Sequence, residues 1–233
     1  MSPPTSPWLV SAHALTRHAE RHRSRVGELF PSQVVPKRIK TESFGEHDVG
    51  FRESRDGSID DLEEATLEFK HFLEDCRSAL DYAAFHLYRS LVTFGPLPEK
   101  TPKVYFPYSE RLTMPADFRS RQVPGTGTWR YAPQEVVDVL MESQPFRHDE
   151  HWWLPRVCET LNEAKHENLV PVHVGDSENG WYYNVGDEWY RFPSRIPLAT
   201  SSRYPKAIDI DHLMMSTVQD LPRILEAVVS VAP

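Results

Sequence analysis

The sequence predicts an α+β fold, in which an antiparallel helical core carries a small, mostly C-terminal antiparallel β portion. The helical core is indicated by apolar residues that recur at steps of three and four along the chain from Ser58 onward. The β portion is indicated after His166, where β-branched and aromatic residues alternate with other residues between turn positions. Because helices and strands occupy largely separate stretches of the chain, the order of elements favours the α+β class.

The N-terminal half is predicted to contain two long helices separated by a hairpin. The first helix covers residues 8–30, and Pro31 ends it. Residues 33–53 are predicted as a β hairpin or two short strands. The longest helix begins near Ser58 and ends at Gly95. Its apolar stripe consists of Leu62, Ala65, Phe69, Phe72, Cys76, Leu80, Ala83 and Leu87.

Shorter helices are predicted in the middle of the chain. Residues 96–131 are irregular, apart from a short strand at 104–106. Pro133 opens a short helix, as proline commonly does in a first turn. Another helix covers residues 150–166, with Asp149 as its N-cap.

The C-terminal part is predicted to be mainly strands. Alternating valines mark a strand at 170–174. Residues 181–183 and 189–192 flank the turn Gly186-Asp187 and form a hairpin rich in aromatic residues. A last strand lies at 208–210, and a closing helix covers 221–229.

Length, charge and hydropathy limit the classes of protein to which the chain can belong. We expect one domain over residues 1–233, made of the N-terminal helix and hairpin (8–53), the helical core (58–166) and the hairpin region with the closing helix (168–230). The net charge of −8 argues against an extensive nucleic-acid surface. No apolar run approaches the roughly 20 residues that span a bilayer, and the first residues lack the pattern of a signal peptide. We therefore expect a cytoplasmic protein with no membrane partner.

Candidate site residues lie on two of the predicted helices. Arg77 and Asp81 are four residues apart in the long helix, and Asn162 and His166 are four apart in the later one, next to Lys165. Residues four apart are neighbours on a helix surface. Since both helices also carry apolar stripes, we expect them to pack together and to bring these five side chains into one cluster.

This cluster has two interpretations. As a functional site, Asp81 would orient His166 in a small acid–base or anion-binding centre. As structure, the same groups would form a buried polar network that satisfies itself and fixes the register of the helices. If the helices are antiparallel with Asp81 level with Asn162, Cys76 and Cys158 lie about 13 Å apart along the axis. A disulfide cannot bridge that distance. Because cytosolic thiols are normally free and Cys packs as a small hydrophobe, we expect two buried, reduced thiols.

Four short motifs resemble, in the same order, those of a family of uncharacterised bacterial proteins. They are RSALDY at 77–82, FPY at 106–108, QPF at 144–146 and NEAKH at 162–166. Ala164 and the Glu that follows the last motif stand where the family often has Asp and Arg, and the loss of that Arg weakens an anion-binding role. The resemblance covers roughly residues 60–170 and implies no activity, because the family has none assigned.

A second resemblance is to the HEPN superfamily of helical, often RNA-cleaving domains, which use an Arg and a His a few residues apart on a helix. Arg17 and His22 have that spacing, although they lie on the first helix rather than a later one. Such a pair can act on a phosphodiester as base, acid and charge stabiliser. The competing interpretation is a solvated helix face.

Two further motifs have structural alternatives. The run His148-Asp149-Glu150-His151 resembles part of a metal site but lacks an evident third ligand, and it also suits a helix start with acidic first-turn residues. The aromatic hairpin is either a stacking or partner surface, or a sheet face packed on helices. We expect no metal and no cofactor.

The sequence thus supports two hypotheses about function. The first is a non-enzymatic binding or interaction protein, with a protein partner or a homo-oligomer, in which the five-residue cluster is structural. The second is a HEPN-like ribonuclease or other phosphodiester-acting enzyme in which His166 works with Lys165 or Arg77.

Overall fold

The fold was analysed in a computed structural model of the chain. It describes residues 7–29, 37–38, 42–43, 49–50, 59–91, 104–108, 132–166, 172–176, 181–185, 188–192, 195–199 and 208–231. The described helices are α1 (Pro7–Leu29), α2 (Ile59–Leu91), α4 (Gln134–Glu142), the 3-10 helix η2 (Asp149–Trp152), α5 (Trp153–His166) and α6 (Ile210–Ser230).

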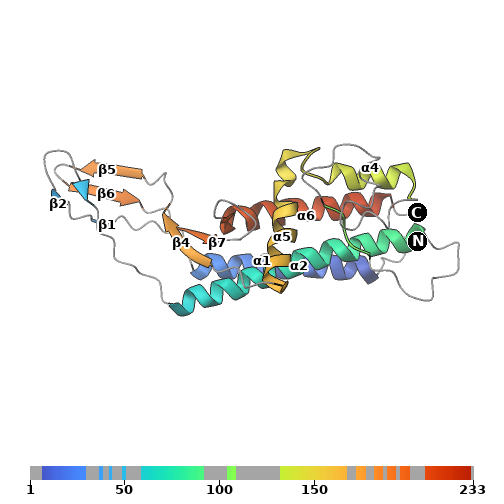
Figure 1. The fold of residues 1–233 in the computed structure, drawn as a ribbon, viewed down its shortest axis with the longest axis horizontal. Helices are drawn as coiled ribbons and strands as arrows, with labels where there is room; N and C mark the ends of the chain where they lie inside the picture. Colours follow the sequence, from blue (N-terminus) through green and yellow to red (C-terminus); the bar gives the residue numbers. More distant parts are fainter. Residues whose placement is uncertain are drawn as a thin grey trace.

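A bundle of long helices forms the body of the molecule. α1, α2 and α6 run along the long axis, and α1 is antiparallel to α2 (Figure 1). α4 lies along α6, whereas α5 crosses α2 and α6 steeply (Figure 1). The predicted helical core is therefore confirmed, and its most extensive contact is between α1 and α2.

The apolar stripe predicted for the long helix is buried. All of its members with described side chains are at most 1% exposed. They share one continuous cluster with residues of α1, α4, α5, α6 and the segment 104–108. On α1, the buried positions Ala12, Ala19 and Val26 are seven residues apart and face the bundle. Small residues at this spacing allow close packing of α1 against its neighbours.

The last helix is longer than the sequence predicts. We expected it over 221–229, but α6 begins at Ile210, where the Asp209 carboxylate accepts the backbone N–H of His212 at 3.0 Å. Pro222 lies just after the predicted start, and proline interrupts the hydrogen bonds of a helix interior. It nonetheless lies inside α6, and the burial of Leu213, Met214 and Leu221 holds the helix together across it.

The helix predicted at 150–166 is also divided. Its first residues form η2, and α5 begins at Trp153. Asp149 is not the N-cap: His148 occupies that position, and its side chain makes no capping hydrogen bond. The predicted strand at 104–106 is wrong as well, since residues 104–108 are not a strand and the Phe106 N–H bonds to the Asp81 carboxylate.

The strands are short segments of two to five residues with antiparallel pairing. Their bounds are β1 (Lys37–Arg38), β2 (Glu42–Ser43), β3 (Val49–Gly50), β4 (Val172–Asp176), β5 (Trp181–Val185), β6 (Glu188–Phe192), β7 (Arg195–Ala199) and β8 (Ile208–Asp209). They pair in the orders β1-β6-β5, β2-β3 and β4-β7-β8, and β7 was not predicted. Within the strands, only Ala199 and the residues of β8 have described side chains. The structure therefore establishes the helical core, but it does not establish the α+β class.

No helix in the described part of the chain is both long enough and apolar enough to cross a bilayer.

Candidate functional site

Arg77 lies at the centre of a polar network in the helical core. It projects from α2 toward α5, and its side chain is 14% exposed. Its Nε and Nη2 atoms donate to the two carboxylate oxygens of Asp81, each at 3.0 Å. The third contact is with α5, where Nη1 donates to the Cys158 sulfur at 3.0 Å. The guanidinium also lies 5.3 Å from the ring centroid of Tyr108, within the range of a cation–π contact.

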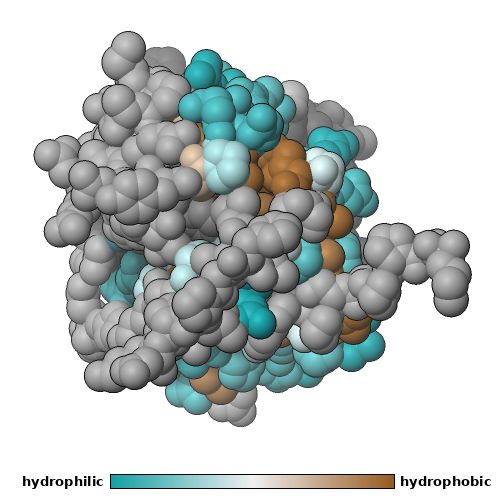
Figure 2. Space-filling view, turned by 90° about the vertical axis from the view of Figure 1, so that its right-hand side faces the viewer, coloured by the Kyte–Doolittle hydropathy of each residue, from teal (hydrophilic) through white to brown (hydrophobic). Residues whose placement is uncertain are grey.

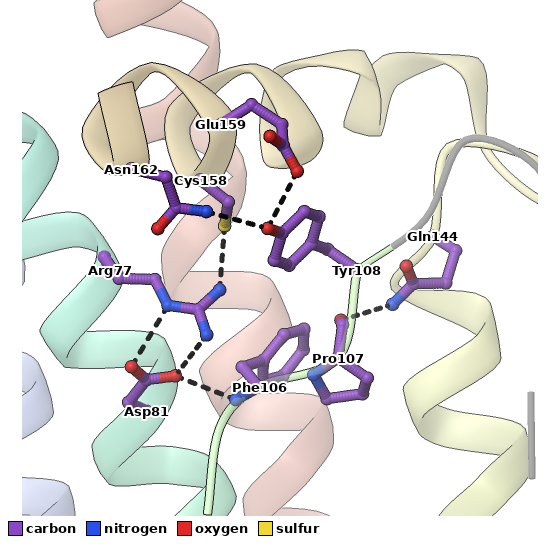
Figure 3. A network of polar contacts seen from close by, with 9 residues as sticks. All are labelled: Arg77, Asp81, Phe106, Pro107, Tyr108, Gln144, Cys158, Glu159 and Asn162. Atoms are coloured by element: carbon purple, nitrogen blue, oxygen red, sulfur yellow. Dashed lines mark hydrogen bonds and ion pairs between the residues drawn. The ribbon is translucent and has the colours of Figure 1, made fainter. Parts of the chain in front are cut away.

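Asp81 connects α2 to the extended segment 104–108. Its Oδ1 atom accepts the backbone N–H of Phe106 at 2.8 Å, in addition to the contact with Arg77 (Figure 3). Phe106 is fully buried, so its N–H needs an acceptor within the protein. The carboxylate therefore serves two buried donors at once, one charged and one neutral.

Tyr108 and Gln144 extend the network to α5 and to the turn after α4. The Tyr108 hydroxyl donates to Glu159 at 2.9 Å and accepts from the Asn162 amide at 3.1 Å. Gln144, which is fully buried, donates its side-chain amide to the Pro107 carbonyl at 3.0 Å. We call the whole set the Arg77 cluster: Arg77, Asp81, Phe106, Pro107, Tyr108, Gln144, Cys158, Glu159 and Asn162 (Figure 3).

The structure brings some of the predicted site residues together and leaves others apart. Arg77 and Asp81 pair as their spacing predicts, whereas Asn162 joins them through Tyr108 rather than directly. Lys165 is exposed, and its charge still acts on Asp81. His166 ends α5, and its side chain lies outside the described residues. A contact between Asp81 and His166 therefore stays a prediction.

α2 and α5 pack together as expected, but they do not lie antiparallel along their lengths. The two helices cross, and Arg77 meets Cys158, one turn before Asn162 (Figures 1 and 3). A crossing confines the contact to a few turns, so α5 does not follow the stripe of α2 along its length. The expectation for Cys76 and Cys158 is confirmed in that both are free and buried.

Sequence reasoning missed the roles of Tyr108, Gln144 and Cys158. The FPY motif at 106–108 and the QPF motif at 144–146 stood out by resemblance alone, without a role. In the structure both motifs meet the RSALDY motif and Asn162 in one network (Figure 3). Because these residues are far apart in the chain, periodicity within a helix could not have grouped them.

Burial and charge set the protonation of the cluster. Burial alone would lower the pKa of Arg77, but the nearby Cys158 and Asp81 raise it, so the guanidinium stays charged. Burial raises the pKa of Asp81, against the opposing effects of Arg77 and the Phe106 N–H. Burial likewise raises the pKa values of the Tyr108 hydroxyl and the Cys158 thiol. Both groups are thus protonated near neutral pH and are poor nucleophiles.

The cluster is well suited to holding elements together. Each of the three nitrogens of Arg77 donates to a protein acceptor, and the Tyr108 hydroxyl both donates and accepts within the protein. A buried network that is satisfied in this way stabilises one arrangement of its helices. Three of the five N–H donors of Arg77 are already engaged by the protein, which is unlike a site prepared for a substrate oxygen.

The other candidate motifs make different contacts from those their spacing suggested, wherever their side chains are described. Arg17 is exposed, whereas His22 lies between α1 and α2, with Nδ1 2.5 Å from Glu68 and Nε2 3.4 Å from Asp75. The two residues therefore point in different directions. His148 contacts Glu142 at 2.8 Å, and no group of three or more potential ligands in the described part is placed to hold a metal ion. The side chains of the aromatic hairpin lie outside the described residues.

Comparison with known proteins gave no match, whether to family models, to curated proteins or to solved structures.

Proposed function

We propose that the chain is a non-enzymatic binding or interaction protein and that the Arg77 cluster is its structural centre. The observation that carries the proposal is the engagement of the Arg77 guanidinium on three sides by Asp81 and Cys158. An anion-binding or catalytic arginine keeps donors available for its ligand. Arg77 instead uses Nε and Nη2 on Asp81 within α2, and Nη1 on Cys158 of α5.

The position of a groove outside the Arg77 cluster supports the same proposal. A groove of about 450 Å³ lies between α1 and α6 and is lined by Val10, His13, Thr16, Arg17 and Pro222. None of these residues belongs to the Arg77 cluster. A ligand in this groove would contact the outside of the bundle and not the buried network.

The alternative is a HEPN-like ribonuclease in which His166 works with Lys165 or Arg77. The exposure of Lys165 suits such a role, but the engagement of Arg77 does not.

The proposal also includes the finer sequence predictions: an α+β class with a small C-terminal β portion, a cytoplasmic location with reduced cysteines, and membership of the bacterial family that the four motifs resemble.

The structural role can be tested at Asp81. Asp81→Ala leaves the Arg77 charge and the Phe106 N–H without their acceptor, and we expect a loss of about 2–4 kcal/mol in the free energy of unfolding. Asp81→Asn keeps one acceptor and should cost less. The matched control is Glu74→Ala, which breaks a half-exposed pair with Lys70 and should cost about 1 kcal/mol or less. Urea unfolding measures all three, and an Asp81→Ala protein as stable as the wild type would contradict the proposal.

The absence of catalysis can be tested with a fluorogenic single-stranded RNA. We expect the wild-type chain to cleave it no faster than an identically purified Lys165→Ala/His166→Ala variant, which controls for contaminating nucleases. Cleavage by the wild type that disappears in His166→Ala, at an unchanged melting temperature, would establish the enzyme and overturn the proposal.

A further inference from the structure

The solvent-facing side of α1 carries cations that the described chain leaves unpaired. α1 contains four arginines, although the whole chain has a net charge of −8. Arg23 and Arg25 each pair with a glutamate at 2.6 Å. Arg17 and Arg21 are exposed, are four residues apart, and make no ion pair with any residue that the structure describes. We call these two residues, together with Val10 and His13, the basic face.

The basic face borders the groove between α1 and α6. Val10, which is 54% exposed, lies in this groove together with His13, Arg17 and Pro222. A concave surface with an apolar centre and cations at its edge fits a convex partner with the reverse pattern, an apolar residue flanked by carboxylates.

The exposed side of α4 has that reverse pattern. Glu135, Asp138 and Glu142 are all exposed and lie on one side of the helix, next to the half-buried Val139. Glu135 suits the positive end of the helix dipole, but Asp138 lies beyond the first turn and has no such explanation. Neither Glu135 nor Asp138 pairs with a cation among the described residues. In Figure 2, hydrophilic residues gather at the top of the coloured surface, above an apolar patch.

We infer that two copies of the chain bind each other through these two faces. The basic face of one copy contacts the acidic face of the other, which consists of Glu135, Asp138, Val139 and Glu142. Arg17 and Arg21 are one helical turn apart, as are Glu135 and Asp138, so both pairs have similar separations of about 5–6 Å. α6 packs against both α1 and α4, which places the two faces beside the same helix. In a two-fold symmetric dimer, the contact between the basic face of one copy and the acidic face of the other occurs twice.

This inference rests on the proposed function, because it names a second copy as the partner of an interaction protein. The two can fail separately. The Asp81 variants report on the stability of one chain, whereas the experiment below reports on association between chains.

Charge reversal tests the inference by sedimentation velocity at up to about 0.1 mM protein. We expect a wild-type dimer that weakens with salt. Arg17→Glu/Arg21→Glu and Glu135→Arg/Asp138→Arg should each raise the dissociation constant at least about 100-fold, because each places like charges in contact. A mixture of the two variants should form a 1:1 complex, and the variant with all four changes should dimerise at the wild-type net charge. Arg17→Lys/Arg21→Lys is the matched control and should remain a dimer.

Three results would overturn the inference. A wild-type monomer at the highest concentration excludes the dimer. A dimer that is indifferent to both reversals uses another surface. Binding of a single-stranded RNA that Arg17→Glu/Arg21→Glu abolishes, without any change in self-association, would assign the basic face to nucleic acid.

Discussion

Asp75 is a partly buried carboxylate whose burial opposes its charge. It faces the seam between α1 and α2, with its side chain 18% exposed, and its Oδ2 atom lies 3.4 Å from His22 Nε2 without a hydrogen bond. Burial raises the pKa of Asp75, while His22, His18 and His71 lower it and Glu74 raises it further. Burial has the largest effect, so the net shift is upward.

The sign of this shift gives a pH dependence. A carboxyl group whose pKa is higher in the folded state binds its proton more tightly there, so its stabilising contribution is complete at low pH and is lost as pH rises through the folded pKa. We expect the stability of the wild type relative to Asp75→Asn to fall as pH rises from about 4 to 7, by at most about 1.4 kcal/mol per pH unit and less with solvent screening.

Urea unfolding of both proteins across this pH range measures the difference. Glu74→Gln removes a neighbouring negative charge that pairs with Lys70 at 3.0 Å, and it controls for the loss of a surface charge. A difference between wild type and Asp75→Asn that is constant with pH, or that grows with pH, would show that burial does not govern Asp75.

At the residue scale, the sequence could predict contacts within one helix but not contacts between segments. The Arg77–Asp81 pair follows from a spacing of four residues. The bond from Asn162 to Tyr108 joins residues 54 positions apart, and nothing local indicates it. Arg77 was expected near Asn162, yet its α5 contact is Cys158, because the crossing angle of the helices is a property of their packing.

At the scale of elements, α1 and α2 pack through small residues on α1. Ala12 and Ala19 are fully buried, and Val26 is 2% exposed. Ala19→Leu adds volume to a packed seam, and we expect a cost of about 1–3 kcal/mol, or a fall of about 2–10 °C in melting temperature. Ala227→Leu makes the same change at an exposed position of α6 and should have little effect.

Thermal unfolding followed by circular dichroism compares the two variants. Equal melting temperatures for Ala19→Leu and the wild type would mean that the α1–α2 seam has room for a larger side chain, contrary to its burial in the structure.

Periodicity predicted the helices well where no proline interrupts it. The apolar stripe of α2 predicted its helix, whereas the first half of α6, before Pro222, was not predicted as a helix. The hydrogen bond that a proline removes can be predicted from the local sequence. The burial of Leu213 and Leu221, which outweighs this loss, depends on tertiary packing. The short strand expected at 104–106 failed for a similar reason, since a side chain of α2 takes the place of a strand partner.

At the scale of the whole molecule, one apolar cluster connects the helices with the end of β7 and with β8. Ala199 and Ile208 belong to the same cluster as the buried residues of α2 and α6. β1, near the N-terminal helix in the chain, pairs with β6 near the C-terminal end. Segments from both halves of the chain thus contact each other, and one domain over residues 1–233 stays a prediction.

A single domain should unfold in one cooperative transition. Trp153 is fully buried in the helical core, while Trp181 and Trp189 lie on β5 and β6, so they report on different parts of the chain. Two variants keep only Trp153, or only Trp181 and Trp189, with phenylalanine at the other tryptophan positions. Within each variant, we expect the urea midpoint by fluorescence to coincide with that by far-UV circular dichroism, because the pairing of β1 with β6 ties the strands to chain on both sides of the helical core. A fluorescence midpoint below the circular dichroism midpoint in the variant with Trp181 and Trp189 would divide the chain into a helical unit and a separately unfolding β portion.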